Sequence, residues 1–195
     1  IERWVTSNPS GTEFGWSYYY QNIYYANAII NKKNEITEGS EAEINQLVGE
    51  AYFMRGYMHF LLVNLYGQPY TKEGAPTSKA IPLKLSLDLE EMPTRNTVEE
   101  IYASILSDIE NARQLINHKE WETGYNYRFS KLAVDAFESR VRLYKGEWQA
   151  AYNAAERVLE QKSTLEDYNN NNSTDFQMPN TYTSVESITA YENVY

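Results

Sequence analysis

Apolar side chains recur every three or four residues over most of the chain, which is the spacing of helices with one buried face. The pattern predicts helices over residues 16–31, 41–66, 97–116, 131–145 and 148–161. Residues 1–15 contain an Asn-Pro-Ser-Gly turn cluster and are predicted to form a lead-in loop. Residues 163–180 lack a helical period, and weak alternation over residues 183–191 predicts no more than a short strand. The predicted fold class is therefore all-α.

The longest predicted helix has clear signals at both ends. Ser40 followed by Glu43 is a capping-box sequence, in which each side chain accepts a hydrogen bond from the other residue's backbone N–H. Gly67 suits a helix C-terminus, and Pro69 cannot continue the helix because it has no N–H group. The apolar stripe between these ends contains one charged residue, Arg55. The other members of the stripe are Ile44, Val48, Ala51, Met58, Leu62 and Leu65.

Arg55 needs a partner if this stripe is buried, because a buried guanidinium must be paired and hydrogen-bonded. Asp108, Asp135 and Glu138 on neighbouring predicted helices are the candidate partners. We interpret Arg55 as one half of a structural ion pair that sets the register of the helices. A role in ligand binding is the alternative hypothesis.

The helices are expected to form antiparallel pairs. Residues 133–160 partly match a tetratricopeptide repeat, which needs small residues at the crossing, a turn glycine and a late inward apolar residue. The matching residues are Ser139, Gly146, Ala151 and Val158. Ala154, Ala155 and Leu159 are expected to face inward with them. The helices on either side of residues 70–95 are interpreted as an earlier pair with a long inserted loop, in which residues 80–87 are apolar and extended. Stacked pairs predict an α/α superhelix with a curved surface.

The composition excludes several classes of partner and site. The 195 residues fit one domain or a large piece of one, with a net charge of −10. Because basic residues do not cluster, no nucleic-acid partner is predicted. The absence of cysteine excludes disulfides and a cysteine nucleophile within these residues. His59 and His118 lack a further histidine at ligand spacing, so no metal site is predicted, and His59 is interpreted as a partly buried packing residue.

No cofactor or catalytic motif stands out either. The chain contains no glycine-rich phosphate loop, nucleophile elbow or HExxH sequence. A carboxylate pair of the glycosidase type remains the enzymatic alternative. A second weak candidate is a calcium site, because acidic and amide residues alternate at Asp167, Asn169, Asn171, Ser173 and Asp175. An EF-hand would need Gly and Glu where Asn172 and Met178 stand, so a solvated loop is preferred.

Several motifs occur in a fixed order along the chain. The first helix carries Trp16, Tyr20, Ile23, Ala26 and Asn27. The second carries Gly49, Glu50, Ala51, Phe53, Arg55, Gly56, Phe60, Leu62, Val63, Tyr66, Gly67 and Pro69. An Ile-Pro-Leu segment at 81–83 precedes Pro93, Arg95, Thr97, Val98, Glu100 and Tyr102. The later pair carries Arg128, Ser130, Ala133, Arg140, Leu143, Tyr144, Gly146, Trp148 and Ala151. Over residues 16–161 this ordered set resembles the SusD/RagB family of outer-membrane nutrient-binding lipoproteins.

The resemblance implies a non-enzymatic protein that binds glycans of the starch or polysaccharide type at the cell surface. It would deliver them to a TonB-dependent, SusC-like transporter of the outer membrane. Such family members are more than twice as long, so residues 1–195 resemble their N-terminal tetratricopeptide-like part, with residues 163–195 beginning a more irregular binding lobe. A lipid-bearing cysteine upstream of Ile1, after an export signal, would be the membrane anchor. The alternative is a tetratricopeptide module that binds proteins or peptides, as in RagB-like peptide uptake.

Candidate ligand residues come from the 18 Tyr and 4 Trp, because aromatic rings can stack on sugar faces. In the starch-binding family member an N-terminal Trp and Asn contribute to the sugar site. The first candidates are Trp4, Asn8, Trp16 and Tyr18, and the second set is Trp121, Tyr125 and Tyr127 in the loop at residues 118–128. Core packing is the competing interpretation for each ring. Structural roles are assigned to Arg55, Asp108, Gly67, Pro69 and Gly146.

Overall fold

The computed structural model describes residues 15–167, 169 and 182–190. The helices are α2 (Trp16–Asn31), α3 (Glu41–Tyr66), α4 (Val98–Leu115), α5 (Lys131–Lys145) and α6 (Trp148–Leu159). Two short 3₁₀ helices, η1 (Lys33–Glu35) and η2 (Ala75–Thr77), and two strands, β1 (Lys79–Pro82) and β2 (Arg95–Thr97), complete the regular structure of these residues. The predicted helices are all present, which confirms the all-α class.

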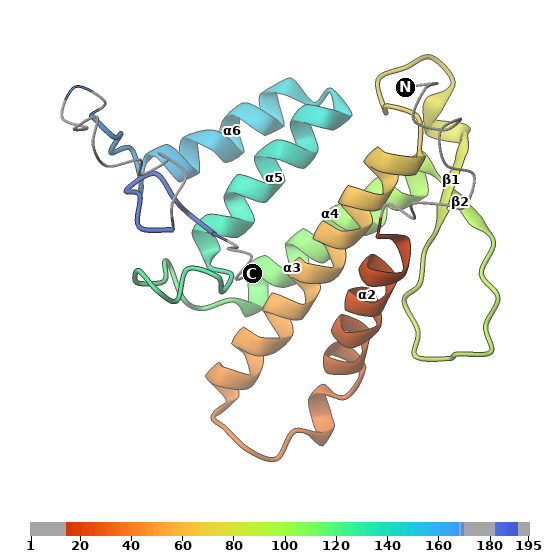
Figure 1. Cartoon of the computed structure of the whole chain (residues 1–195), viewed down its shortest axis with the longest axis horizontal. Helices are drawn as coiled ribbons and strands as arrows, with labels where there is room; N and C mark the ends of the chain where they lie inside the picture. The colour runs from red at the N-terminus through yellow and green to blue at the C-terminus, as the bar shows by residue number, and fades with distance from the viewer. Residues whose placement is uncertain (1–14, 168, 170–181, 191–195) are drawn as a thin grey trace.

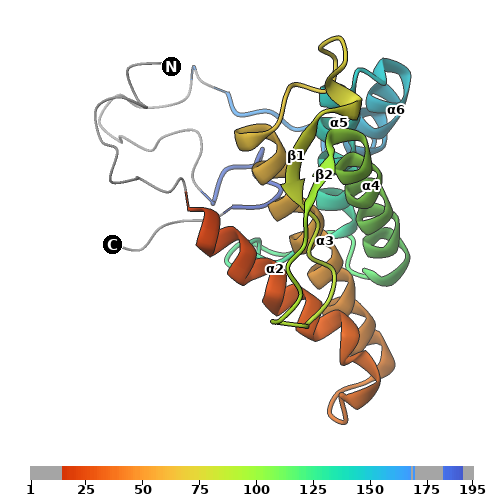
Figure 2. The same cartoon turned by 90° about the vertical axis from the view of Figure 1, so that its right-hand side faces the viewer.

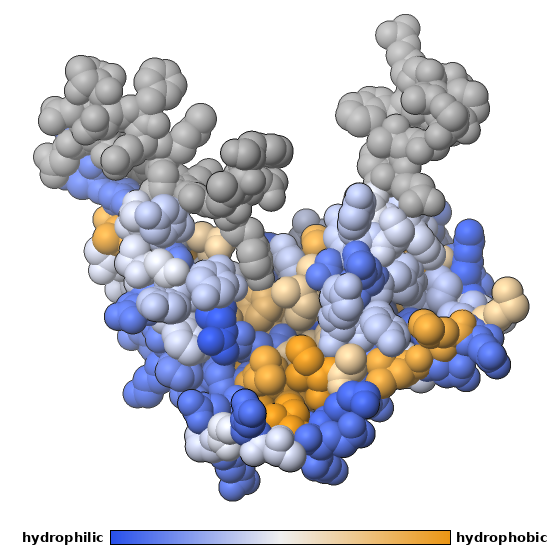
Figure 3. All heavy atoms as spheres, turned by 60° about the horizontal axis from the view of Figure 1, so that its bottom comes forward, coloured by the Kyte–Doolittle hydropathy of each residue, from blue (hydrophilic) through white to orange (hydrophobic). Residues whose placement is uncertain are grey.

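The helices pack in the order of the chain. Figures 1 and 2 show α2, α3 and α4 side by side, with the α5–α6 pair continuing from α4. Both predicted pairs form, because α3 packs on α4 and α5 packs on α6. At the second crossing the Ser139 hydroxyl donates to the carbonyl of Ala151 at 3.0 Å, and Ala151 and Ala154 are buried. Figure 3 shows one face that is hollowed, with hydrophobic residues at its bottom.

Local sequence signals define the helix ends. The capping box of α3 forms as predicted, since Glu43 Oε2 accepts the N–H of Ser40 at 2.8 Å and Ser40 Oγ accepts the N–H of Glu43 at 3.3 Å. The same arrangement of Thr97 and Glu100 begins α4. After α5, Gly146 has a φ of 81°, a left-handed conformation that glycine adopts without strain and that permits the tight turn into α6.

Gly67 ends α3 for a different reason from the one that applies at Gly146. Its φ is −99°, which any residue can adopt. A Cβ atom there would lie 2.6 Å from the carbonyl oxygen of Val63 and 3.0 Å from Cβ of Ala80 in β1. Glycine is therefore required mainly because a Cβ atom would collide with the last turn of α3 itself, and the close approach of β1 adds to the crowding.

Protonation of Glu43 is expected to weaken the first turn of α3. The hydrogen bond from the Ser40 backbone favours the carboxylate and lowers the pKa of Glu43 below its ordinary value of 4.5. Because the folded pKa lies below the unfolded one, this stabilisation is present above the unfolded value and is lost as the pH falls through the folded value. In an NMR titration the Ser40 amide should follow the midpoint of the Glu43 carboxyl. Glu43→Gln should abolish that titration and Glu41→Gln should preserve it, and the reverse pattern would contradict the expectation.

The core lies between α3, α4 and α5. Its fully buried side chains include Leu62, Val63, Ile101, Ile105, Val134 and Val141. The expectation that Leu65 and Leu159 are buried is wrong, because both are half-exposed. Leu65 lies in the last turn of α3, where its neighbours Asn64 and Tyr66 are exposed as well. α6 packs on α5 through Ala151 and Ala154, and Leu159 lies off that line.

Arg55 ties three helices together. Its guanidinium donates to both carboxylate oxygens of Asp108 in α4, with Nε–Oδ2 at 3.0 Å and Nη2–Oδ1 at 2.5 Å. Nη1 also donates to Oδ1 of Asn27 in α2 at 2.9 Å. Burial raises the pKa of Asp108, and the bonds from Arg55 oppose that rise. The other two candidate partners, Asp135 and Glu138, pair instead with arginines of α4 and α6.

His59 is more completely buried than the sequence suggested. Its exposed fraction is 0%, where partial burial was expected. Burial, followed by the positive charge of Arg55, lowers the pKa of His59 to about 3, so the ring is neutral at physiological pH. In the described residues no group of three or more His, Cys, Asp or Glu side chains is placed to hold a metal ion.

Extended structure is confined to the small β1–β2 sheet in the described part of the chain. The two strands pair antiparallel, with Lys79 opposite Thr97 and Pro82 opposite Arg95. The prediction of a short strand over residues 183–191 is wrong for residues 183–190, because residues 182–190 form turns and bends. Residue 191 lies outside the described residues. Within the described ranges no helix has both the length and the apolar character that a bilayer crossing needs.

Candidate functional site

The aromatic loop between α4 and α5 is held against α3 by Gln46. The buried amide oxygen of Gln46 accepts the backbone N–H groups of Asn117 at 2.9 Å and His118 at 3.1 Å. Its amide nitrogen donates to the carbonyl of Phe129 at 3.0 Å. One side chain thus holds both ends of the loop against α3.

Trp121 is enclosed by other groups of the same loop. The His118 ring stacks on it at 3.9 Å between centroids, and the Arg128 guanidinium lies 4.7 Å from the centre of its ring. Arg128 in turn donates to both carboxylate oxygens of Glu50 at 2.7 to 3.1 Å, and this pairing raises the pKa of Arg128. The indole N–H donates to the carbonyl of Phe129 at 3.0 Å. Trp121 therefore has a fixed orientation.

The segment at residues 182–190 is attached to this loop by Asn126. The amide nitrogen of the buried Asn126 donates to the carbonyl of Tyr182 at 2.7 Å. The backbone N–H of Ala190 donates to the carbonyl of Asn126 at 3.0 Å. One residue thus binds both ends of the segment and places its middle beside α5.

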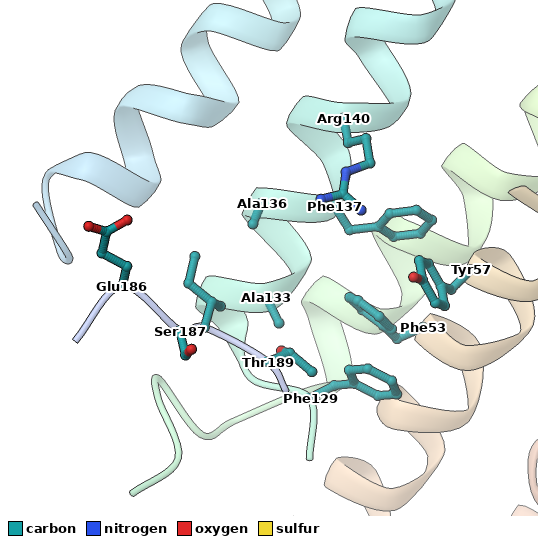
Figure 4. A pocket seen from close by; sticks show the side chains of 11 residues that line it. Phe53, Tyr57, Phe129, Ala133, Ala136, Phe137, Arg140, Glu186, Ser187 and Thr189 are labelled. Atoms are coloured by element: carbon teal, nitrogen blue, oxygen red, sulfur yellow. The ribbon is translucent and has the colours of Figure 1, made fainter. Parts of the chain in front are cut away.

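An aromatic pocket of about 330 Å³ lies between this segment, α3 and α5 (Figure 4). The aromatic side chains Phe53, Tyr57, Phe129 and Phe137 line one side, and Phe53 and Phe129 stack at 3.9 Å. Space for a ligand is left by the small side chains of Ala133 and Ala136. The lining also includes the polar residues Arg140, Glu186, Ser187 and Thr189.

A polar pocket of about 370 Å³ lies on the other side of the same segment. Its lining includes Trp121, Asn126, Gln161, Thr164, Tyr182 and Ser184. Ser187 lines both pockets, so the two are adjacent. Lys162 and Glu120, which also line the polar pocket, form an ion pair with each other.

The N-terminal candidates do not lie at these pockets as far as the structure describes them. Trp4 and Asn8 lie outside the described residues. Trp16 packs against Tyr20 and Tyr66, with ring centroids 4.9 Å apart in both cases. Tyr18 is exposed on α2 and lines neither pocket.

The three loop candidates differ in their position, because Trp121 lines a pocket and Tyr125 and Tyr127 line neither. Trp121 lines the polar pocket. Tyr125 and Tyr127 are exposed on either side of Asn126, with ring centroids 6.4 Å apart.

The calcium candidates are only partly described. The carboxylate of Asp167 accepts two bonds from Asn169, and Asn171, Ser173 and Asp175 lie outside the described residues.

Sequence reasoning missed the aromatic pocket. Phe53 and Phe137 have the helical spacing of core residues, and nothing local distinguishes a core ring from one that lines a pocket. The usable signal was the pair of alanines, Ala133 and Ala136, beside Phe137 on the inner face of α5. The contribution of Ser187 depends on the bonds of Asn126, which no short motif encodes.

Comparisons with known proteins agree with the resemblance. A SusD-like family model, described as "starch-binding associating with outer membrane", matches residues 2–143. SusD-like protein P38 of Formosa agariphila is 32% identical over 151 residues, which cover 77% of this chain and 27% of that protein.

Solved structures give the same result. A SusD superfamily protein of Bacteroides thetaiotaomicron superposes with a TM-score of 0.72 at 32% identity, over 79% of this chain and 34% of that one. A protein of Bacteroides vulgatus described as a putative sugar binding protein has a TM-score of 0.67 at 32% identity, over 74% and 32%. The chain thus spans 27–34% of the length of these relatives. The family match covers well over half of the chain, and the chain belongs to the SusD-like family.

Proposed function

We propose that this chain is the N-terminal helical part of a cell-surface protein that binds oligosaccharides and passes them, uncleaved, to a TonB-dependent transporter of the outer membrane. The observation that carries the proposal is the family match, whose description combines starch binding with the outer membrane. A lipid anchor upstream of Ile1 would hold the protein at the cell surface.

The paired pockets suit the two kinds of surface that a sugar presents. A pyranose ring has an apolar C–H face and a rim of hydroxyl groups, so its sites combine aromatic surface with directed polar groups. The aromatic pocket supplies the first, and Asn126, Gln161 and Thr164 of the polar pocket supply the second. Each volume falls in the range of roughly 300–1,000 Å³ typical of ligand sites. An oligosaccharide that crosses Ser187 would use both pockets.

The acidic side chains that line the pockets support binding of a glycan without cleavage of its glycosidic bonds. A typical glycosidase places two carboxyl groups about 5–9.5 Å apart across the scissile bond. The aromatic pocket has one acid in its lining, Glu186. The polar pocket also has one, Glu120, and it is engaged by Lys162. Among the described residues, neither pocket by itself has the two carboxyl groups that an acid and a base for hydrolysis require.

The test is a calorimetric screen of the natural protein against a panel of polysaccharides and oligosaccharides, starch fragments included, with peptides as a parallel panel. Saturable binding of at least one glycan is expected, and product analysis should show no new reducing ends. Binding of peptides but of no glycan would replace the proposal with the peptide-binding alternative. Release of shorter sugars would contradict the non-enzymatic role.

A further inference from the structure

The loop between β1 and β2, residues 83–94, presents apolar side chains to solvent. Leu89 is 79% exposed and Met92 is 93% exposed, and Leu85 in the same loop is 43% exposed. Single exposed apolar residues are ordinary on protein surfaces, whereas a group of them on one projecting segment indicates an interaction site. Figure 1 shows the loop extending beyond the two strands alongside α2.

The loop is braced by its own polar side chains. The carboxylate of Glu91 accepts from Lys84 Nζ at 2.7 Å and also from the hydroxyl of Ser86. Lys84 Nζ donates to the carbonyl of Asp88 as well, and Oδ1 of Asp88 accepts the backbone N–H of Glu90 at 2.9 Å. These bonds give residues 88–92, the tip of the loop with its apolar side chains Leu89 and Met92, a defined shape before any partner binds.

The base of the loop is fixed to the helical core. Tyr20 donates its hydroxyl to the carbonyl of Pro82 at 2.7 Å, and Asn27 donates to the carbonyl of Lys84 at 3.0 Å. Asn27 is the residue that also bonds Arg55. Because hydrogen bonds from α2 hold the base of the loop, binding through the loop would cost less conformational entropy than binding through a free segment.

The chemistry of the tip specifies its partner. Asp88 and Glu90 flank Leu89, and neither forms an ion pair with the residues that the structure describes. Such a tip complements an apolar depression edged by Lys or Arg. An anionic lipid surface would repel it. A sugar is not the expected ligand of the tip, because Leu89 and Met92 have no aromatic ring on which a sugar could stack.

We propose that residues 83–94 form a docking element that inserts Leu89 and Met92 into an apolar depression with a basic rim on the outer-membrane transporter. The inference rests on the transporter partnership of the proposed function and adds the surface that makes the contact. The acidic side chains would steer the approach, and the two apolar side chains would provide most of the buried area.

The experiment uses the natural protein, tagged and expressed together with a TonB-dependent, SusC-like transporter of its own organism. Transporter recovered with the tagged protein after mild solubilisation is measured for wild type, for Leu89→Ser/Met92→Ser and for a matched control, Leu143→Ser/Leu165→Ser, which changes exposed leucines elsewhere. We expect recovery to fall about tenfold or more in the loop variant, equivalent to about 1.4 kcal/mol. The control should recover wild-type amounts.

The possible outcomes separate the two proposals. Wild-type recovery in the loop variant would overturn the docking inference and leave the proposed function standing. Failure of the wild type to bring down the transporter would overturn the partnership and this inference with it. A lower melting temperature of the loop variant, or a wild-type dimer that the variant dissociates, would show that another part of the protein or a second copy covers the tip, and would also overturn it. Glycan binding should be equal in all three proteins.

Discussion

Replacing Arg55 with alanine is expected to lower the free energy of unfolding by about 3–5 kcal/mol, because it leaves a buried charge without its partner. Asp108 is 1% exposed and receives two of its hydrogen bonds from Arg55. For a chain of this size the loss corresponds to a fall in melting temperature of roughly 6–20 °C. Circular dichroism during thermal and urea denaturation measures both quantities.

Two further variants show whether the effect comes from the buried charge. Arg55→Met/Asp108→Leu removes both charges and should recover much of the stability, because apolar residues of similar volume often replace a buried ion pair without loss. Lys32→Ala breaks an exposed pair, in which the Lys32 and Glu35 side chains are 57% and 68% exposed, and should cost about 0.5 kcal/mol or less. Wild-type stability of Arg55→Ala would show that the pair has no structural role.

The sequence predicted correctly those features that depend only on residues close together in the chain. Ser40 with Glu43 and the turn at Gly146 each require only residues within one helical turn, and each was predicted as the structure has it. The helix pairs could be predicted from the spacing of apolar side chains, because a helix with one apolar stripe needs a neighbouring helix to bury it. The family resemblance used the same residues, so the fold and the family were predicted together.

The sequence did not show which of several residues far apart in the chain form ion pairs with each other. Arg55 had three candidate acids, and only the packing of α3 on α4 brings Asp108 within reach. Asp135 and Glu138 instead lie between Arg113 of α4 and Arg157 of α6, and each accepts from both. These two acids connect consecutive helices of the superhelix, a role that depends on how α5 is rotated about its axis.

The candidate site was the least predictable part. Its aromatic side is built from rings that are also core residues, and its other side is a segment without helix or strand. The polar anchors, Gln46 and Asn126, bond backbone groups far away in the chain, and hydrogen bonds to distant backbone leave no trace in a sequence. Tyr125 and Tyr127 were predicted from their aromatic rings in a loop; they are exposed but line neither pocket, so their role in binding stays a prediction.

Filling the aromatic pocket is expected to weaken oligosaccharide binding by about tenfold or more, a change of about 1.4 kcal/mol in binding free energy. Ala136 lines the pocket from α5 and is half-buried, so Ala136→Phe places a ring in the space that the sugar would occupy. Because the new ring enters an existing cavity and leaves the core intact, the melting temperature should change little. Isothermal calorimetry with the best glycan of the screen measures the affinity.

The matched control is Ala103→Phe, which adds the same ring at an exposed position of α4 that lines neither pocket. It should bind as the wild type does. A third variant, Thr164→Phe, fills the polar pocket. If Thr164→Phe alone loses binding, the sugar occupies the polar pocket and the aromatic one is a packing defect. If both pocket variants bind normally, the contacts lie outside these pockets, and the paired pockets are not the site at which this protein holds its ligand.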